Sequence, residues 1–142
     1  MKQLKIAISL ITASMLLYAC PKYEVDYITF VNKSESRIVF QPHFLNANPT
    51  NEDTLFQCTK GGFNIHPDTL YRLGAGRHSN WENEMKRYSH LQLLVMDYKI
   101  LSNYLATPCD TIRKYVPILH RYQLTLEDLR RMNWTVVYPP EK

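Results

Sequence analysis

The feature that most constrains the fold is a nearly continuous apolar run, "HLQLLVMDY", at residues 90–98. Such a run is typical of a central strand that is buried on both faces. Short segments rich in β-branched and aromatic residues flank it, and these favour strands too. The expected strands, about seven in all, are 27–32, 37–41, 55–58, 68–76, 90–98, 118–124 and 134–138. Most spacings are too short for repeated βαβ crossovers. We therefore predict a mainly β, antiparallel, β-sandwich-like domain with about three short helical insertions.

Cap signals predict where these helices begin. A Ser or Thr side chain accepts a free N–H of the first helical turn, and an acid three residues later can accept from the cap residue in return. Proline suits the first helical position because it has no N–H to satisfy. The predicted starts are Ser79 with Glu82, Thr107 with Pro108 and Asp110, and Thr125 with Asp128. After the last helix we expect Trp134 to begin a strand and to be buried, with Val136 and Tyr138 on its face.

The first two strands look like a hairpin. "YITFVN" (27–32) and "RIVFQ" (37–41) are separated by the polar connection "KSES", and this arrangement predicts a β-hairpin. Pro42 is expected to end the second strand, because proline cannot donate to a ladder. Residues 43–54 are rich in Asn, Pro and Thr, which predicts a loop.

The chain starts with a segment typical of export. Lys2 and Lys5 precede thirteen uncharged residues, 6–18. This run is shorter than the roughly 20 apolar residues that span a bilayer, but it suits a signal-peptide core. The following "LYAC" resembles the lipobox of bacterial lipoproteins, in which cleavage precedes an acylated cysteine. The alternative is an ordinary secretory signal cut near Ala19, with Cys20 left unmodified.

The lipobox resemblance implies a domain plan. Residues 1–19 would be a cleaved signal peptide, and Cys20 would carry lipid, including a fatty acyl group such as palmitate. Residues 20–26 would form the anchor and a short tether, followed by a single β-rich domain at 27–142. No Asp follows Cys20, which favours the outer membrane, facing either the periplasm or the cell surface.

Charge and cysteine content narrow the choice of partners. Without residues 1–19 the chain has 15 basic and 13 acidic residues and no long basic block, so nucleic-acid binding has little support. Two further cysteines remain, Cys58 and Cys109. An exported chain permits a disulfide between them, while two free buried thiols are the alternative. Their spacing matches no metal or redox motif.

The C-terminal segment "RYQLTLEDLRRMNWTVVYPP" (121–140) is distinctive. It resembles the signature of small, uncharacterised lipoproteins of gut Bacteroidetes, which read R-Y-x-L-T-x-E-D-L and then N-W-x-x-x-Y-P. "VNKSESRIVF" resembles the hydrophobic-Asn-x-Ser opening of the same family. The resemblance implies a secreted, β-rich lipoprotein, and it brings no known catalytic or binding residues.

Residues that could carry chemistry are scattered. The five histidines, at 43, 66, 78, 90 and 120, have no metal-site spacing, and no nucleophile or phosphate-loop motif is present. We therefore expect no catalytic residue, metal or cofactor. Tyr71, Trp81 and Tyr88 lie nearest turns and helix ends and are candidates for an exposed ligand platform.

These observations favour an outer-membrane or cell-surface lipoprotein that acts as a non-enzymatic accessory or interaction module. It would be held on the membrane by lipid, and its partner would be an envelope protein or a glycan. The alternatives are a small envelope or polysaccharide-acting hydrolase, a glycan-binding module, and a structural lipoprotein without a ligand.

Overall fold

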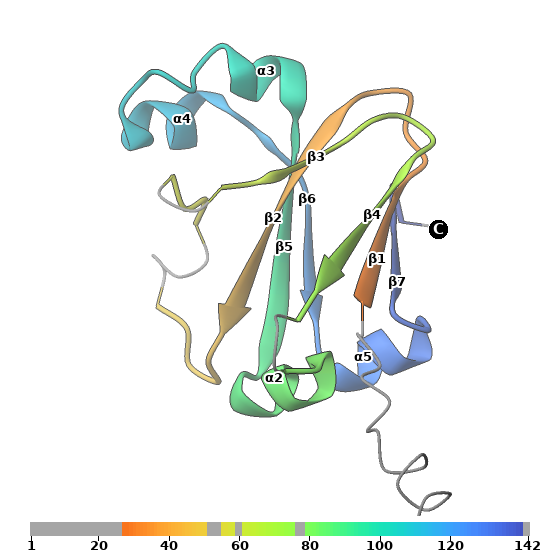
Figure 1. The fold of residues 1–142 in the computed structure, drawn as a ribbon. Coiled ribbons are helices and arrows are strands. Elements are labelled where there is room, and N and C mark those ends of the chain that lie inside the picture. Colours follow the sequence, from red (N-terminus) through yellow and green to blue (C-terminus); the bar gives the residue numbers. More distant parts are fainter. Residues whose placement is uncertain (1–26, 51–54, 59–60, 76–78, 141–142) are drawn as a thin grey trace, which may run out of the picture.

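The computed structural model describes residues 27–50, 55–58, 61–75 and 79–140. This part of the chain holds seven strands and four short helices (Figure 1). The strands are β1 (Tyr27–Asn32), β2 (Ile38–Leu45), β3 (Phe63–Ile65), β4 (Leu70–Gly74), β5 (His90–Asp97), β6 (Ile118–Leu124) and β7 (Thr135–Tyr138). The helices are α2 (Trp81–Arg87), α3 (Tyr98–Ser102), α4 (Cys109–Tyr115) and α5 (Leu126–Arg131). The prediction of a mainly β, sandwich-like fold is confirmed.

The strands form two sheets, in the orders β4-β1-β7 and β3-β2-β5-β6. The pairing of β1 with β7 is parallel, whereas the other strand pairs are antiparallel. Figure 1 shows α2 and α5 at one end of the sandwich and α3 and α4 at the other. The two ends of the domain therefore carry different helical layers.

The predicted hairpin of the first two strands is wrong. β1 pairs with β4 and β7, while β2 pairs with β3 and β5, so the "KSES" connection crosses from one sheet to the other. Two adjacent strand-forming segments can pair with each other or pack face to face. Their alternation does not distinguish these outcomes.

Pro42 does not end β2, which continues to Leu45 and so takes up the start of the predicted loop. Pro42 lies opposite Leu93 of β5, whereas β3 accompanies β2 only from Ile38 to Phe40. At Pro42 one edge of β2 is therefore open within the described chain. Proline is tolerated there because no ladder hydrogen bond is needed from its nitrogen.

The inner core fills the space between the two sheets. Phe30 of β1 and Phe40 of β2 meet across it, with ring centroids 4.2 Å apart. Helices α2 and α5 close one end of this core with Trp81, Met85 and Leu129. Its other buried members are Ile28, Ile38, Ile65, Leu91, Leu93, Val95, Leu124 and Val136.

A second core lies on the opposite face of the four-stranded sheet. Val39, Leu94 and Met96 point to that side and pack beneath Leu101 of α3 and Ile112 of α4. Residues Leu91 to Met96 of β5 are all buried, so the prediction of a strand covered on both faces is confirmed. Helix α3 was not predicted from the sequence.

The cap predictions have mixed outcomes. Thr125 and Asp128 form the predicted reciprocal capping box at α5. The cap of α2 is Asn80, one residue after Ser79, and its side chain accepts from the backbone N–H of Asn83 at 2.9 Å. The cap of α4 is Pro108 rather than Thr107 and makes no side-chain cap bond.

The predicted start of the last strand is also shifted. Asn133 and Trp134 both have positive φ angles, 47° and 57°, and β7 begins at Thr135. The Trp134 ring is partly buried against the inner core, while Val136 is fully buried as expected. Residues 55–58 form no strand, whereas the short strand β3 was missed.

Candidate functional site

Residues 55–58, here called the strap, run beside the helical end formed by α3 and α4. A disulfide joins Cys58 of the strap to Cys109 at the start of α4, with the two Cα atoms 5.7 Å apart. The predicted bridge is confirmed. It ties the strap to the helical layer across 51 residues of sequence.

Two further side chains hold the strap in place. Gln41, fully buried in β2, donates from Nε2 to the carbonyl of Gln57 and accepts from its N–H at Oε1, both at 2.8 Å. Arg113 of α4 donates from Nε to the carbonyl of Phe56 at 3.0 Å. The Gln41 amide thus makes the pair of bonds that a neighbouring strand would make, which explains how the strap is ordered without being a strand.

A groove of about 320 Å³ lies between the strap and the α3–α4 layer, over the outer face of β2 and β3. We call it the cap groove. Among the described residues, its lining contains no acid, histidine, lysine or arginine. The lining residues are Val39, Phe56, Cys58, Gly61, Gly62, Asn64, Tyr98, Leu101, Ser102, Leu105, Thr107 and Ile112.

Two hydroxyl groups in the cap groove, those of Ser102 and Thr107, are already used as donors. Ser102 Oγ donates to the carbonyl of Lys99 at 2.9 Å, and Thr107 Oγ1 donates to the carbonyl of Tyr104 at 2.7 Å. Both bonds stabilise the end of α3 and the turn after it. What the groove offers a ligand is therefore chiefly apolar surface, with the exposed Asn64 amide at one side.

The groove walls are held rigidly. The Arg37 guanidinium lies 3.8 Å from the centre of the Tyr98 ring, which fixes the ring by a cation–π contact. A Cβ at Gly62 would collide with Val39 Cγ1, so the wall there requires glycine. A Cβ at Gly61 would meet no described atom within 4 Å. Gly61 therefore borders open space.

The aromatic platform predicted from Tyr71, Trp81 and Tyr88 is wrong. Trp81 is buried, and its Nε1 donates to the carbonyl of Leu73 at 2.9 Å. The Tyr71 ring packs on the inner core, and Tyr88 stacks on Phe44 with centroids 4.7 Å apart. Tyr71 on β4, Trp81 at the start of α2 and Tyr88 at its end all pack against other side chains, so they do not form one exposed surface.

The C-terminal signature residues have structural roles. Tyr122 of β6 donates from its hydroxyl to the carbonyl of Val137 in β7 at 2.6 Å, which joins the two sheets. Burial raises the pKa of Tyr122 to about 12. Hydrogen bonds from Thr125, first from its backbone N–H at 3.0 Å, hold the pKa of Asp128 below its ordinary value.

The Asn-x-Ser opening also has a structural role. Asn32 is fully buried at the end of β1, and its Nδ2 donates to the carbonyl of Ser36 at 2.7 Å. The same amide donates to the carbonyls of Ile65 and His66, both at 3.2 Å. Its Oδ1 accepts from the backbone N–H of Ser34 at 3.0 Å. Asn32 therefore joins two of the connections that cross between the sheets, the one from β1 to β2 and the one from β3 to β4.

The acids near the helices are engaged in ion pairs. Glu82 of α2 accepts from Arg130 of α5 at 2.9 Å, and Asp128 pairs with Arg131 as well as capping α5. Within the described ranges, no three His, Cys, Asp or Glu side chains come together as a metal site. His78, Cys20 and the whole predicted signal and tether lie outside the described residues.

The groove residues were missed from the sequence because they come from five separate segments. Gly61 and Gly62 follow the predicted strand 55–58 without any binding motif, and the apolar Leu105 gave no periodic signal. None of the helices in the described part of the chain is long and apolar enough to cross a membrane. No family model matches the chain, and neither does any curated protein or solved structure.

Proposed function

We propose that the protein is an exported, lipid-anchored binding module of the outer membrane and that its ligand site is the cap groove. The observation that carries the proposal is a concave, uncharged site held open by a disulfide and by the Gln41 and Arg113 contacts. Small-molecule sites are concave, mostly apolar and largely pre-formed. Acid–base chemistry needs a titratable group within reach of the substrate, and the described part of the groove lining contains no acid and no histidine.

Two features support export and anchoring. Structural disulfides persist in oxidising compartments and are rare in the cytosol, which suits the Cys58–Cys109 bridge. The lipobox-like "LYAC" at 17–20 supplies an acylation site. Two or three acyl chains, at about 0.8 kcal/mol for each buried CH₂, give stable anchoring.

The anchor and the groove belong to opposite ends of the domain. β1 begins at Tyr27, and its neighbour Ile28 pairs with Leu73, whose carbonyl accepts from Trp81 of α2. The tether at 21–26 reaches at most about 20 Å, while β5 separates the α2 end from the α3 end by roughly 27 Å. An anchored domain would therefore present the cap groove away from the membrane.

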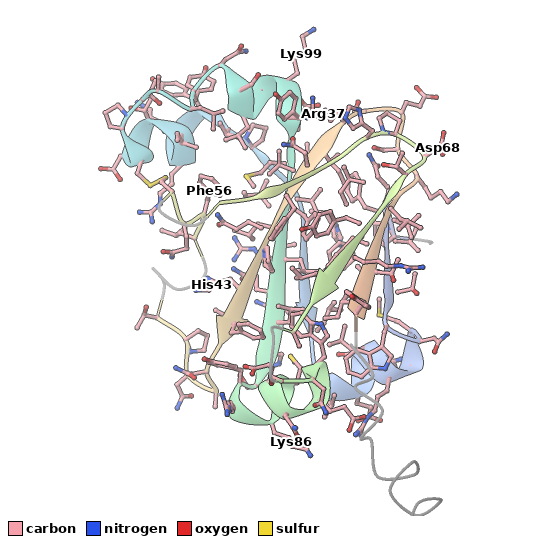
Figure 2. The ribbon with its side chains drawn as sticks, viewed as in Figure 1. Arg37, His43, Phe56, Asp68, Lys86 and Lys99 are labelled. Atoms are coloured by element: carbon pink, nitrogen blue, oxygen red, sulfur yellow. A yellow bond between two sulfur atoms is a disulfide. The ribbon has the colours of Figure 1, made fainter. Side chains whose placement is uncertain are left out.

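Two exposed lysines provide a matched test of this arrangement. Lys86 of α2 and Lys99 of α3 lie at opposite ends of the domain (Figure 2). Each is changed to cysteine in the lipoprotein, which is then reconstituted in phosphatidylethanolamine–phosphatidylglycerol vesicles. We expect a bulky maleimide–polyethylene glycol to label Lys99→Cys faster than Lys86→Cys.

The control is the same pair in a Cys20→Ser background. That protein should remain in the supernatant when vesicles are sedimented, and its two positions should react at equal rates. Equal rates in the vesicle-bound protein would contradict the proposed orientation. An unmodified Cys20 thiol in the mature chain, measured by intact mass, would contradict the anchor.

A further inference from the structure

We propose that the cap groove binds the aliphatic chain of an uncharged amphiphile taken up from the aqueous phase. It rests on the proposed function for the choice of site, and it adds the class of ligand. It depends on the charge, hydrogen-bonding capacity and accessibility of the groove.

Charge is the first criterion. A charged group that leaves water without a partner loses a large solvation energy, and none of the lining residues that the structure describes carries a charge that could replace it. Among the described residues two cations contact the lining, Arg37 over the Tyr98 ring and Arg113 at the carbonyl of Phe56, and both are engaged there. The chemistry of the groove therefore complements an uncharged ligand.

Hydrogen-bonding capacity is the second criterion. A sugar presents hydroxyl groups around its whole ring, and each buried hydroxyl needs a partner. The donors of Ser102 and Thr107 are directed into the protein backbone, which leaves the Asn64 amide and the Tyr98 hydroxyl as the polar side-chain groups for a ligand among the described lining residues. A ligand with one polar head group on an otherwise aliphatic chain fits this arrangement.

The rim of the groove is the third criterion. Leu105 lines the groove and is nevertheless 63% exposed, the highest value among the exposed large apolar side chains of the described chain. Covering it with an aliphatic chain would remove apolar surface from both molecules, at about 25 cal/mol for each Å². At about 320 Å³ the groove falls at the small end of the range for ligand sites.

The groove lies at the α3–α4 end of the domain, opposite the α2 end near which β1 begins. In an upright, lipid-anchored molecule this end faces the aqueous phase, and we take that phase as the source of the chain. The occupant would then be an amphiphile that diffuses in the aqueous compartment.

The test uses the chain from residue 20 with Cys20→Ser, which keeps every residue of both cores. Primary n-alkanols of increasing length are titrated while the methyl resonances of Val39, Leu101 and Ile112 are followed by NMR. We expect affinity to rise about three- to fourfold for each added CH₂ until the groove is filled. Carboxylates of the same chain length should bind more weakly.

Three variants assign the binding to the groove. Gly61→Trp places a ring in the open space beside Gly61 and should abolish alkanol binding without unfolding the protein. Leu105→Asn should weaken binding by several-fold. Leu70→Asn is the matched control, because Leu70 is also an exposed leucine, on β4 away from the groove, and its affinity should equal that of the parent.

Several results would overturn the inference: affinity independent of chain length, carboxylates binding as well as alkanols, or alkanol binding that survives Gly61→Trp. Stronger groove binding by maltose than by any alkanol would reject the aliphatic class while leaving the groove as the binding site of the proposed function. Methyl resonances that respond to no probe would count against both.

Discussion

Removal of the Cys58–Cys109 disulfide provides a quantitative test of how the strap is stabilised. The bridge closes a loop over a sequence separation of 51 residues. In the chain-entropy model this closure removes about 14 cal/mol/K from the unfolded ensemble, or about 4 kcal/mol at 25 °C. The strap keeps its bonds to Gln41 and Arg113 when the bridge is absent. The native structure should therefore persist while the unfolded state gains freedom.

The assay is urea unfolding of the oxidised protein and of the double variant Cys58→Ala/Cys109→Ala, both with Cys20→Ser. We expect a loss of about 4 kcal/mol in the free energy of unfolding, together with a larger m value, because the unlinked chain exposes more surface. The variant should also melt roughly 12–20 °C lower, given the usual shift in Tm for each kcal/mol in a domain of this size.

The matched control is Gln41→Ala in the oxidised protein, which keeps the bridge and removes the amide that pairs with Gln57. It should cost about 1–3 kcal/mol, because the buried backbone groups of Gln57 lose their partners. A double variant as stable as the oxidised parent would refute the entropic reasoning. Two free thiols titrated in the unfolded, unreduced protein would show that the bridge does not form in solution.

Three further predictions concern single positions. Gly62→Ala should destabilise the domain by about 1–3 kcal/mol through overpacking, while Gly61→Ala, which borders open space, should be near neutral in the same urea titration. Burial raises the pKa of Tyr122 to about 12. The stability that this tyrosine contributes is therefore complete below about pH 10 and is lost as the pH rises toward 12. Tyr122→Phe should flatten this alkaline loss in thermal melts, and an unchanged alkaline slope would contradict the raised pKa of Tyr122. Thr125→Ala should cost about 1 kcal/mol and Trp134→Ala roughly 3 kcal/mol, and two variants as stable as the parent would mean that the C-terminal signature is not structural.

Features encoded over a few consecutive residues were predicted well. The apolar run 90–98 identified β5, because a strand covered on both faces must be apolar along its whole length. The pair Thr125 and Asp128 identified the start of α5, because a capping box involves only four adjacent residues. At Ser79 the same logic failed by one residue: the Ser79 hydroxyl donates to Glu84 at 2.5 Å, and Asn80 takes the cap instead.

Features that depend on distant partners were not predictable. The strand pattern of 27–32 is equally compatible with pairing to β2 and with packing against it, and the pairing with β7 has no local signal. Trp81 follows a cap and was expected near the surface, but its helix turns the ring into the inner core. The cap groove combines β2, β3, the strap, α3 and α4, so it exists only after the four-stranded sheet, the strap and the two helices have come together.

The parallel pairing of β1 with β7 has a consequence for biosynthesis. β1 is the first strand of the domain to be synthesised and β7 is the last, and their ladder runs from Thr29 opposite Thr135 to Asn32 opposite Tyr138. Chains emerge from the ribosome or a translocation channel with the N-terminus leading, and contacts distant in sequence form slowly. The three-stranded sheet must therefore remain incomplete, with one edge of β1 unpaired, until β7 has emerged. A chain stalled before Thr135 would expose that edge to other proteins, so quality control would have an unpaired strand to recognise until β7 is made.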